Sequence, residues 1–123
     1  MSLNQRDTLH AQTVKIRSEL YRQKARLFTT EFVLLETADA LTSPILRTGV
    51  AMLIAELRRQ TAVRVIPVTS ALIDSGLDLY ARRPDKEWSL TDCISFAVMD
   101  AEECSVALTQ DHHFVQEGYR ILL

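Results

Sequence analysis

Long apolar runs are absent from this chain of 123 residues. None approaches the roughly 18 residues expected of a membrane-spanning helix, so we expect neither a membrane span nor a membrane partner. Residues 1–7 are polar and lack the apolar core of a signal peptide, so we expect no secretory leader. The composition is 47% hydrophobic and 24% charged, which is typical of one globular domain over residues 1–123.

Cysteine and glycine are both scarce. The only two cysteines, Cys93 and Cys104, fall in one predicted helix, whose rise would separate them by about 16 Å, too far for a disulfide. Two free thiols favour a reducing, cytoplasmic location. Three glycines leave little room for a glycine-rich phosphate loop. Neither a Gly-x-Ser-x-Gly elbow nor a zinc-type Cys/His spacing is present.

The net charge of -2 gives no overall attraction to nucleic acid, so any RNA binding needs a local basic patch. One small basic cluster, formed by Arg82, Arg83 and Lys86, lies in a charged segment. A solvated loop is its simpler interpretation, and contact with RNA phosphates is the alternative.

Short apolar strands alternate with amphipathic helices along the chain. Strands are expected at 26–30, 63–68, 105–109 and 119–123. Helices are expected at 8–24, 31–41, 44–60 and 70–81, and a further helix begins after Ser89. A short helical turn is expected at 112–116. In the helix over 70–81, we expect Leu72, Ile73, Leu77 and Tyr80 to face inward. The alternation predicts a parallel α/β sheet covered on both faces, with its functional crevice beyond the carboxyl ends of the strands.

Asp92 is the most informative acid, because it lies in the first turn of a strongly apolar helix. A carboxylate beside an apolar run is costly unless something holds it. Asp92 stands three residues after Ser89, which is the spacing of a capping box, so satisfying backbone N–H groups is an equally good interpretation.

Two further acids have a similar character. Glu36 shares a helix face with apolar residues, although its side chain can also reach solvent from the margin of that face. Asp111 follows an apolar strand and could instead cap the short helical turn after it. Clustered carboxylates repel one another unless a cation is present, so the three acids together predict a Mg²⁺ or Mn²⁺ site. Supporting hydrogen bonds would come from Ser89, Thr91 and Thr109.

Three segments that contain these acids resemble successive motifs of PIN-domain proteins, and most of all the VapC-like toxins of bacterial type II toxin–antitoxin systems. They are residues 29–36 (TTEFVLLE), 88–96 (WSLTDCISF) and 107–114 (ALTQDHHF). The resemblance runs from about Asn4 to Leu123, and the middle motif is the most specific.

The resemblance implies a three-layer α/β/α sandwich around a parallel sheet. It also implies a Mg²⁺- or Mn²⁺-dependent endoribonuclease that an antitoxin protein holds inactive. Glu36, Asp92 and Asp111 match the metal-site acids, and Ser89 and Thr91 match supporting polar groups. Homodimerisation is a further expectation, because the first two helices carry more apolar residues than one small core needs.

The chain departs from the family pattern at its start. Family members open with an apolar strand that ends in an acidic metal ligand, whereas residues 4–7 (NQRD) resemble the loop that follows it. The resemblance therefore implies an N-terminally truncated domain with four strands, weak metal binding and impaired cleavage. It also predicts that the gap in the sheet is closed, either by direct pairing of strands 26–30 and 105–109 or by another chain. A non-catalytic module that binds RNA or protein is the alternative function, and another metal-dependent nuclease or phosphatase is a third.

Overall fold

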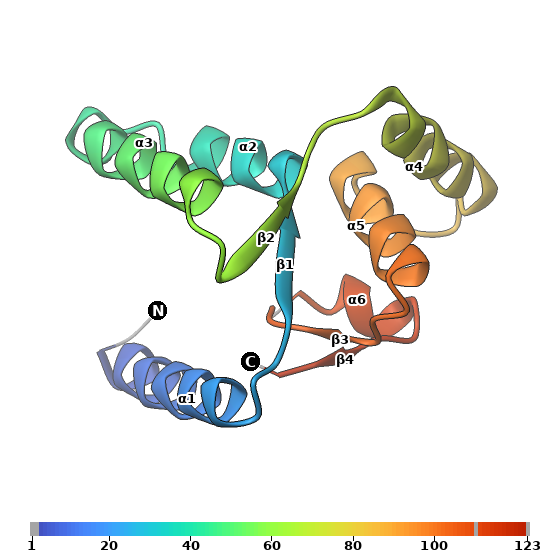
Figure 1. The fold of residues 1–123 in the computed structure, drawn as a ribbon. Helices are drawn as coiled ribbons and strands as arrows, with labels where there is room; N and C mark the ends of the chain where they lie inside the picture. The colour runs from blue at the N-terminus through green and yellow to red at the C-terminus, as the bar shows by residue number, and fades with distance from the viewer. Residues whose placement is uncertain (1–2, 110, 123) are drawn as a thin grey trace. The chain divides into compact units, whose positions relative to one another are not determined.

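The computed structural model describes residues 3–109 and 111–122, in which helices alternate with short parallel strands (Figure 1). The chain divides into two compact units. One unit spans Arg26–Cys104, and the other joins the residues up to Ala25 with those from Ser105 on. The α/β class expected from the sequence is confirmed, and the described residues contain the four expected strands.

The unit Arg26–Cys104 is built on a parallel strand pair. Strand β1 (Leu27–Thr30) pairs with β2 (Val63–Ile66), and Thr30 lies opposite Ile66 in the register. Helix α2 (Glu31–Ala40) follows β1 without a loop. The buried Thr30 side chain accepts the N–H of Val33 at 3.1 Å, so one residue ends the strand and caps the helix.

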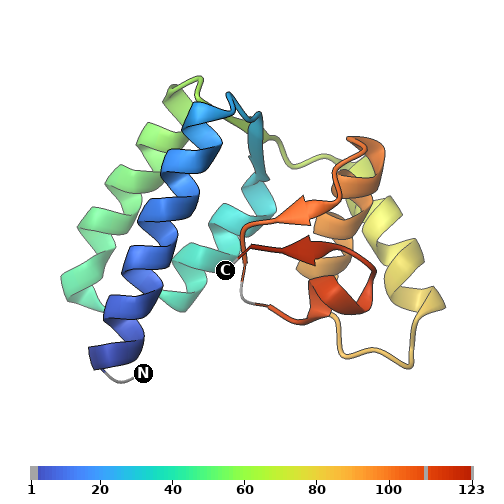
Figure 2. The same cartoon turned by 90° about the horizontal axis from the view of Figure 1, so that it is seen from below.

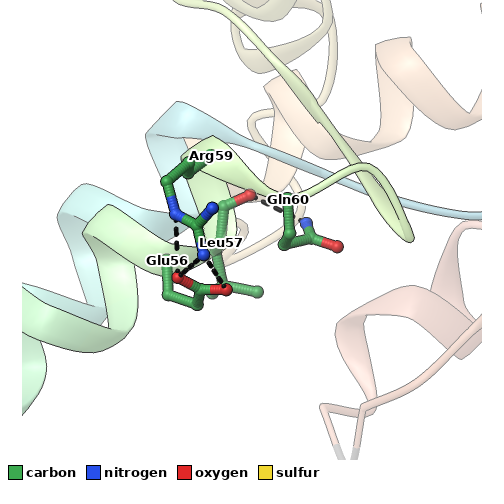
Figure 3. Close-up of polar contacts among 4 residues, drawn as sticks. All are labelled: Glu56, Leu57, Arg59 and Gln60. Atoms are coloured by element: carbon green, nitrogen blue, oxygen red, sulfur yellow. Dashed lines mark hydrogen bonds and ion pairs between the residues drawn. The ribbon is translucent and has the colours of Figure 1, made fainter.

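Helix α3 (Pro44–Arg59) ends in a polar turn that leads into β2 (Figure 3). Arg59 and Glu56 form an ion pair with an N–O distance of 2.6 Å. Gln60 donates to the carbonyl oxygen of Leu57 at 2.8 Å. The same side chain accepts the N–H of Val63 at 2.9 Å. These bonds satisfy backbone groups at the helix end and fix the start of the strand.

Helices α4 (Ser70–Arg82) and α5 (Leu90–Ala101) pack against each other (Figure 1). Gly76 is the buried residue of α4, and a Cβ atom there would lie 2.4 Å from Cγ1 of Ile94. The expected inward positions of Leu77 and Tyr80 are wrong, because these side chains are 45% and 52% exposed. The contact face of α4 passes through a glycine, which carries no hydrophobic signal in the sequence.

The apolar core lies mainly on and just before α5. Trp88 packs edge-to-face on Phe96, with ring centroids 5.1 Å apart and an interplanar angle of 76°. The buried apolar residues of the described chain are Leu34, Ile66, Trp88, Cys93, Ile94, Phe96, Val98 and Met99. This packing fixes the first turn of α5. Cys104 lies beyond the end of α5, not within it as expected, and both cysteines are free thiols.

The other unit contains helix α1 (Leu3–Arg22), strands β3 (Val106–Ala107) and β4 (Arg120–Ile121), and the short helix α6 (His113–Gln116). β3 and β4 run side by side and parallel, with α6 in the connection between them (Figure 2). Gly118 has a φ of 100°, a left-handed conformation that favours glycine, and leads the chain from α6 to β4. Both strands are shorter than expected, and Leu123, the end of the expected last strand, lies outside the described residues.

One further expectation is corrected. Residues 4–7, interpreted as a loop, are helical, because no proline or glycine interrupts them and α1 begins at Leu3. Strand β1 pairs with β2 and β3 with β4. Direct pairing of strands 26–30 and 105–109, which belong to different units, stays a prediction. Each strand takes its partner from its own unit. No helix in the described part of the chain combines the length and apolar character needed to cross a bilayer.

Candidate active site

Asp92 is held at the start of α5 by a reciprocal cap. The Ser89 hydroxyl oxygen accepts the N–H of Asp92 at 3.0 Å, and Oδ2 of Asp92 accepts the N–H of Ser89 at 3.2 Å. This is the capping box that the spacing predicts. The buried Trp88 next to Ser89 anchors the entry to the helix, so the position of Asp92 is set by both packing and hydrogen bonds.

The Asp92 carboxylate has little access to water, since the residue is only 9% exposed. Its neighbours along the helix, Cys93 and Ile94, are more deeply buried still. The positive N-terminal end of α5 favours a negative charge at this point, which offsets part of the cost of burial. The capping role of Asp92 is therefore confirmed. It engages one carboxylate oxygen with Ser89, and a role in metal binding stays a prediction.

Glu36 lies in the second turn of α2, in the same unit as Asp92. Its side chain is exposed, as expected for a carboxylate that reaches solvent from the margin of an apolar face. The buried residue of this helix is Leu34, two positions earlier. A metal-binding role for Glu36 stays a prediction.

Asp111 belongs to the other unit and organises the entry to α6. Its N–H donates to the Thr109 hydroxyl at 3.0 Å, and its Oδ1 accepts the N–H of His113 at 2.9 Å. The N-cap residue of α6 is His112. Asp111 lies one residue before this cap and accepts the N–H of His113, the first residue of the helix. The expected bond to the helix start is present, but the cap assignment itself is wrong by one residue.

His113 is a candidate that the sequence analysis passed over. Its Nδ1 lies 3.3 Å from Oδ1 of Asp111, so the two side chains converge on one point. Adjacent residues such as His112 and His113 do not share a face of a regular helix, so helical periodicity gives no signal for them. The spacing of Asp111 and His113, two residues apart at the start of a turn, is the signal that could have found this pair.

The supporting residues differ in what the structure shows for them. Ser89 and Thr109 each bind the backbone N–H of the acid that they were expected to support. Thr91 is partly buried in the first turn of α5. Asp92 and Glu36 belong to one unit and Asp111 to the other, so the convergence of the three acids stays a prediction.

The basic cluster is partly neutralised by acids. Arg82 pairs with Asp78 at 2.9 Å, and Arg83 donates two hydrogen bonds of 3.0 Å to Asp85. The guanidinium of Arg83 lies 5.2 Å from the ring centroid of Trp88, and the ammonium of Lys86 lies 5.9 Å from it. Arg83 and Lys86 therefore both lie close to the Trp88 ring, and the three residues line a cavity of about 510 Å³. Their contact with RNA stays a prediction.

A family model described as the PIN domain matches residues 3–117. This chain belongs to the PIN-domain family. It is also similar to the crystal structure of Mycobacterium tuberculosis VapC20, described as a sarcin–ricin loop cleaving toxin. That match has a TM-score of 0.70 and 30% sequence identity, and covers 83% of this chain and 78% of that chain. Among curated proteins, none matches the chain significantly. The resemblance to VapC-like PIN domains is confirmed.

The donor atoms of this PIN domain fit the divalent metal that its family implies. Asp92, Asp111 and Glu36 present carboxylate oxygens, which are hard ligands of the kind that Mg²⁺ and Mn²⁺ prefer. The thiol of Cys93, next to Asp92, is fully buried in the core. The chemistry of the residues therefore agrees with an oxygen-rich cation site.

Proposed function

We propose that this chain is a toxin-like endoribonuclease that hydrolyses RNA phosphodiester bonds with a carboxylate-bound Mg²⁺ or Mn²⁺. The observation that carries the proposal is Asp92, a nearly buried carboxylate fixed in the first turn of α5 within the most specific family motif. Membership of the PIN-domain family and the likeness to a sarcin–ricin loop cleaving toxin support the same function.

In this mechanism the chain's own residues hold the negatively charged carboxylates in fixed positions. Asp92, Asp111 and Glu36 would bind the cation, which when bound supplies water activation and stabilises charge on the phosphodiester. The Ser89 N–H holds Oδ2 of Asp92, and the Thr109 hydroxyl holds the backbone of Asp111. Acids oriented before the substrate arrives lower the entropic cost of reaching the transition state. Thr91 would supply a further supporting hydrogen bond at the metal site.

The proposed substrate is a structured RNA, by analogy with the RNA loop named for VapC20. Arg82, Arg83 and Lys86 would contact its phosphates. Arg83 and Lys86 over Trp88 offer two cations on a rigid apolar base, although Asp78 and Asp85 offset part of the positive charge. This contact would raise affinity without selecting sequence.

The proposed partners are a cognate antitoxin protein, which would hold the nuclease inactive in the cytoplasm, and a second copy of the chain. Several large apolar side chains on and beside α2 and α3 are exposed, and the antitoxin or the second copy would cover them. They are Leu35, Leu41, Ile45, Leu46, Met52 and Leu53. Leu35 also lines a cavity of about 270 Å³ with Ile54 and Val68. Light scattering after size-exclusion chromatography would measure the oligomeric state directly.

A non-catalytic module that binds RNA or protein is the second candidate. It is favoured by the backbone bonds of Asp92 and Asp111, which give both acids a structural role without any cation. Incubating the protein with a sarcin–ricin loop hairpin and a tRNA mixture, with Mn²⁺ or with EDTA, separates the two. Cleavage that needs Mn²⁺ supports the nuclease, and its rate tests the predicted impairment. Binding of RNA without cleavage would contradict the nuclease and support the module.

A further inference from the structure

We propose that His113 is a ligand of the metal site and that its imidazole nitrogen favours a transition-metal ion, such as Mn²⁺, over Mg²⁺. The inference rests on the proposed metal-dependent function, and it adds a residue outside the carboxylate set. It is carried by the relation between His113 and Asp111, which lie in the same unit and in the same turn.

The geometry of this pair suits two donors to one ion. Nδ1 of His113 lies 3.3 Å from Oδ1 of Asp111. Two donors at right angles, each about 2.1 Å from a small divalent cation, are separated by about 3 Å. The backbone N–H of His113 binds the same Oδ1 at 2.9 Å, so the turn itself holds the imidazole and the carboxylate together.

Access from solvent is also adequate. The side chains of His113 and Asp111 are 32% and 38% exposed, so an ion could reach both without opening the fold. His113 begins α6, whose first turn is anchored by the bonds of Asp111 to Thr109 and to the helix. The imidazole is therefore attached to an ordered turn beside a proposed ligand.

The mixed donor pair has a chemical consequence. Mg²⁺ prefers an all-oxygen octahedron and keeps its waters, whereas transition-metal ions bind imidazole nitrogen readily. Adding one nitrogen to a carboxylate site should therefore raise the affinity for Mn²⁺ more than that for Mg²⁺. His113→Gln should weaken Mn²⁺ binding about tenfold or more, and should change Mg²⁺ binding less.

Electron spin-echo measurements on the Mn²⁺-loaded protein test this directly, because they detect nitrogen bound to the ion. The full chain is compared with His113→Gln and with His112→Gln, which removes the neighbouring exposed imidazole as a matched control. We expect nitrogen coupling in the full chain and in His112→Gln, and its loss in His113→Gln. His113→Asp should restore binding with a lower ratio of Mn²⁺ to Mg²⁺ affinity. Circular dichroism checks that each variant is folded.

Contrary outcomes separate this inference from the proposed function. Mn²⁺ bound without nitrogen coupling, or coupling that persists in His113→Gln, would overturn the role of His113 and leave the metal-dependent nuclease standing. If the chain fails to bind Mn²⁺ at millimolar concentration and Asp92→Asn does not change the cleavage rate, both the role of His113 and the metal-dependent nuclease are overturned.

Discussion

Ser89 and Asp92 each satisfy a backbone N–H of the other at the start of α5, at 3.0 and 3.2 Å. The acid proposed to bind the metal therefore also stabilises the helix that carries it. A substitution at Asp92 can alter chemistry and stability together, so the two effects must be measured separately. A substitution at Ser89 separates the effect on stability from the effect on chemistry, because its hydroxyl takes part in the cap but carries no charge.

Ser89→Ala should destabilise the fold while leaving the Asp92 carboxylate in place. Losing a serine cap costs about 1 kcal/mol, which urea unfolding would show as a lower midpoint with an unchanged slope. The Ser89 N–H still binds Asp92 in this variant, so metal-dependent cleavage should fall by a smaller factor than in Asp92→Asn. An unchanged midpoint would show that the cap contributes nothing to stability.

Gly76→Ala should destabilise the packing of α4 on α5. The new methyl group would meet Cγ1 of Ile94 at 2.4 Å and its backbone nitrogen at 3.2 Å, so the helices must move apart. Overpacking of this kind costs about 1–3 kcal/mol in the free energy of unfolding. Gly49→Ala in α3 is the matched control, because the added group would meet no atom within 4 Å beyond its chain neighbours and the adjacent helix backbone. That exposed change should stabilise by about 0.4–1 kcal/mol.

Glu31→Ala should weaken the link between α2, α3 and the segment after β2. One Glu31 oxygen accepts the N–H of Val68 at 2.8 Å, and the other lies 3.1 Å from Nε of Arg58. The first-turn acid also suits the positive helix end, so we expect a loss of about 1–2 kcal/mol in chemical denaturation. Arg58→Ala removes only a largely exposed pair and should cost less than about 1 kcal/mol. Equal losses in the free energy of unfolding of Glu31→Ala and Arg58→Ala would contradict a larger contribution from the other interactions of Glu31.

RNA affinity should fall when the positive charge of the basic cluster is reduced. Replacing Arg82, Arg83 or Lys86 by Gln should lower affinity and reduce the slope of log K against log salt by about 1 for each phosphate contact. Asp85→Asn should act oppositely, because it removes the acid that partly neutralises Arg83. The hydrogen bonds from Arg83 hold the pKa of the Asp85 carboxyl below its usual value, so mild acidification cannot replace the substitution. Filter binding at several salt concentrations measures these changes, and no change in any variant would remove the cluster from the RNA surface.

Much of the fold could be predicted because its signals are local. The capping-box spacing of Ser89 and Asp92 predicts the cap that the structure shows, and Thr30 caps α2 in the same local way. The inward face of α4 could not be predicted, because its central contact is Gly76 against Ile94 and a glycine gives no apolar signal. The strand pairing also escaped prediction, since a two-residue strand such as β3 depends on a partner that is distant in sequence.

The sequence gives local signals for some residues of the candidate site and none for others. Asp92 stood out because an acid in an apolar run must be held, and the structure shows what holds it. His113 did not stand out, because its significance depends on its distance from Asp111 and not on a helical periodicity. The metal roles of Glu36, Asp92 and Asp111 remain predictions that only binding and cleavage can test.

The most direct test is cleavage of a sarcin–ricin loop hairpin with Mn²⁺ by the full chain, Asp92→Asn and Ser89→Ala, each checked for folding. Asparagine can still accept the Ser89 N–H, so Asp92→Asn should remain folded and lose the carboxylate charge. We expect a fall in cleavage rate of at least about 100-fold for Asp92→Asn and a smaller fall for Ser89→Ala. Cleavage by Asp92→Asn at the rate of the full chain, or cleavage that continues in EDTA, would contradict a metal-dependent nuclease centred on Asp92.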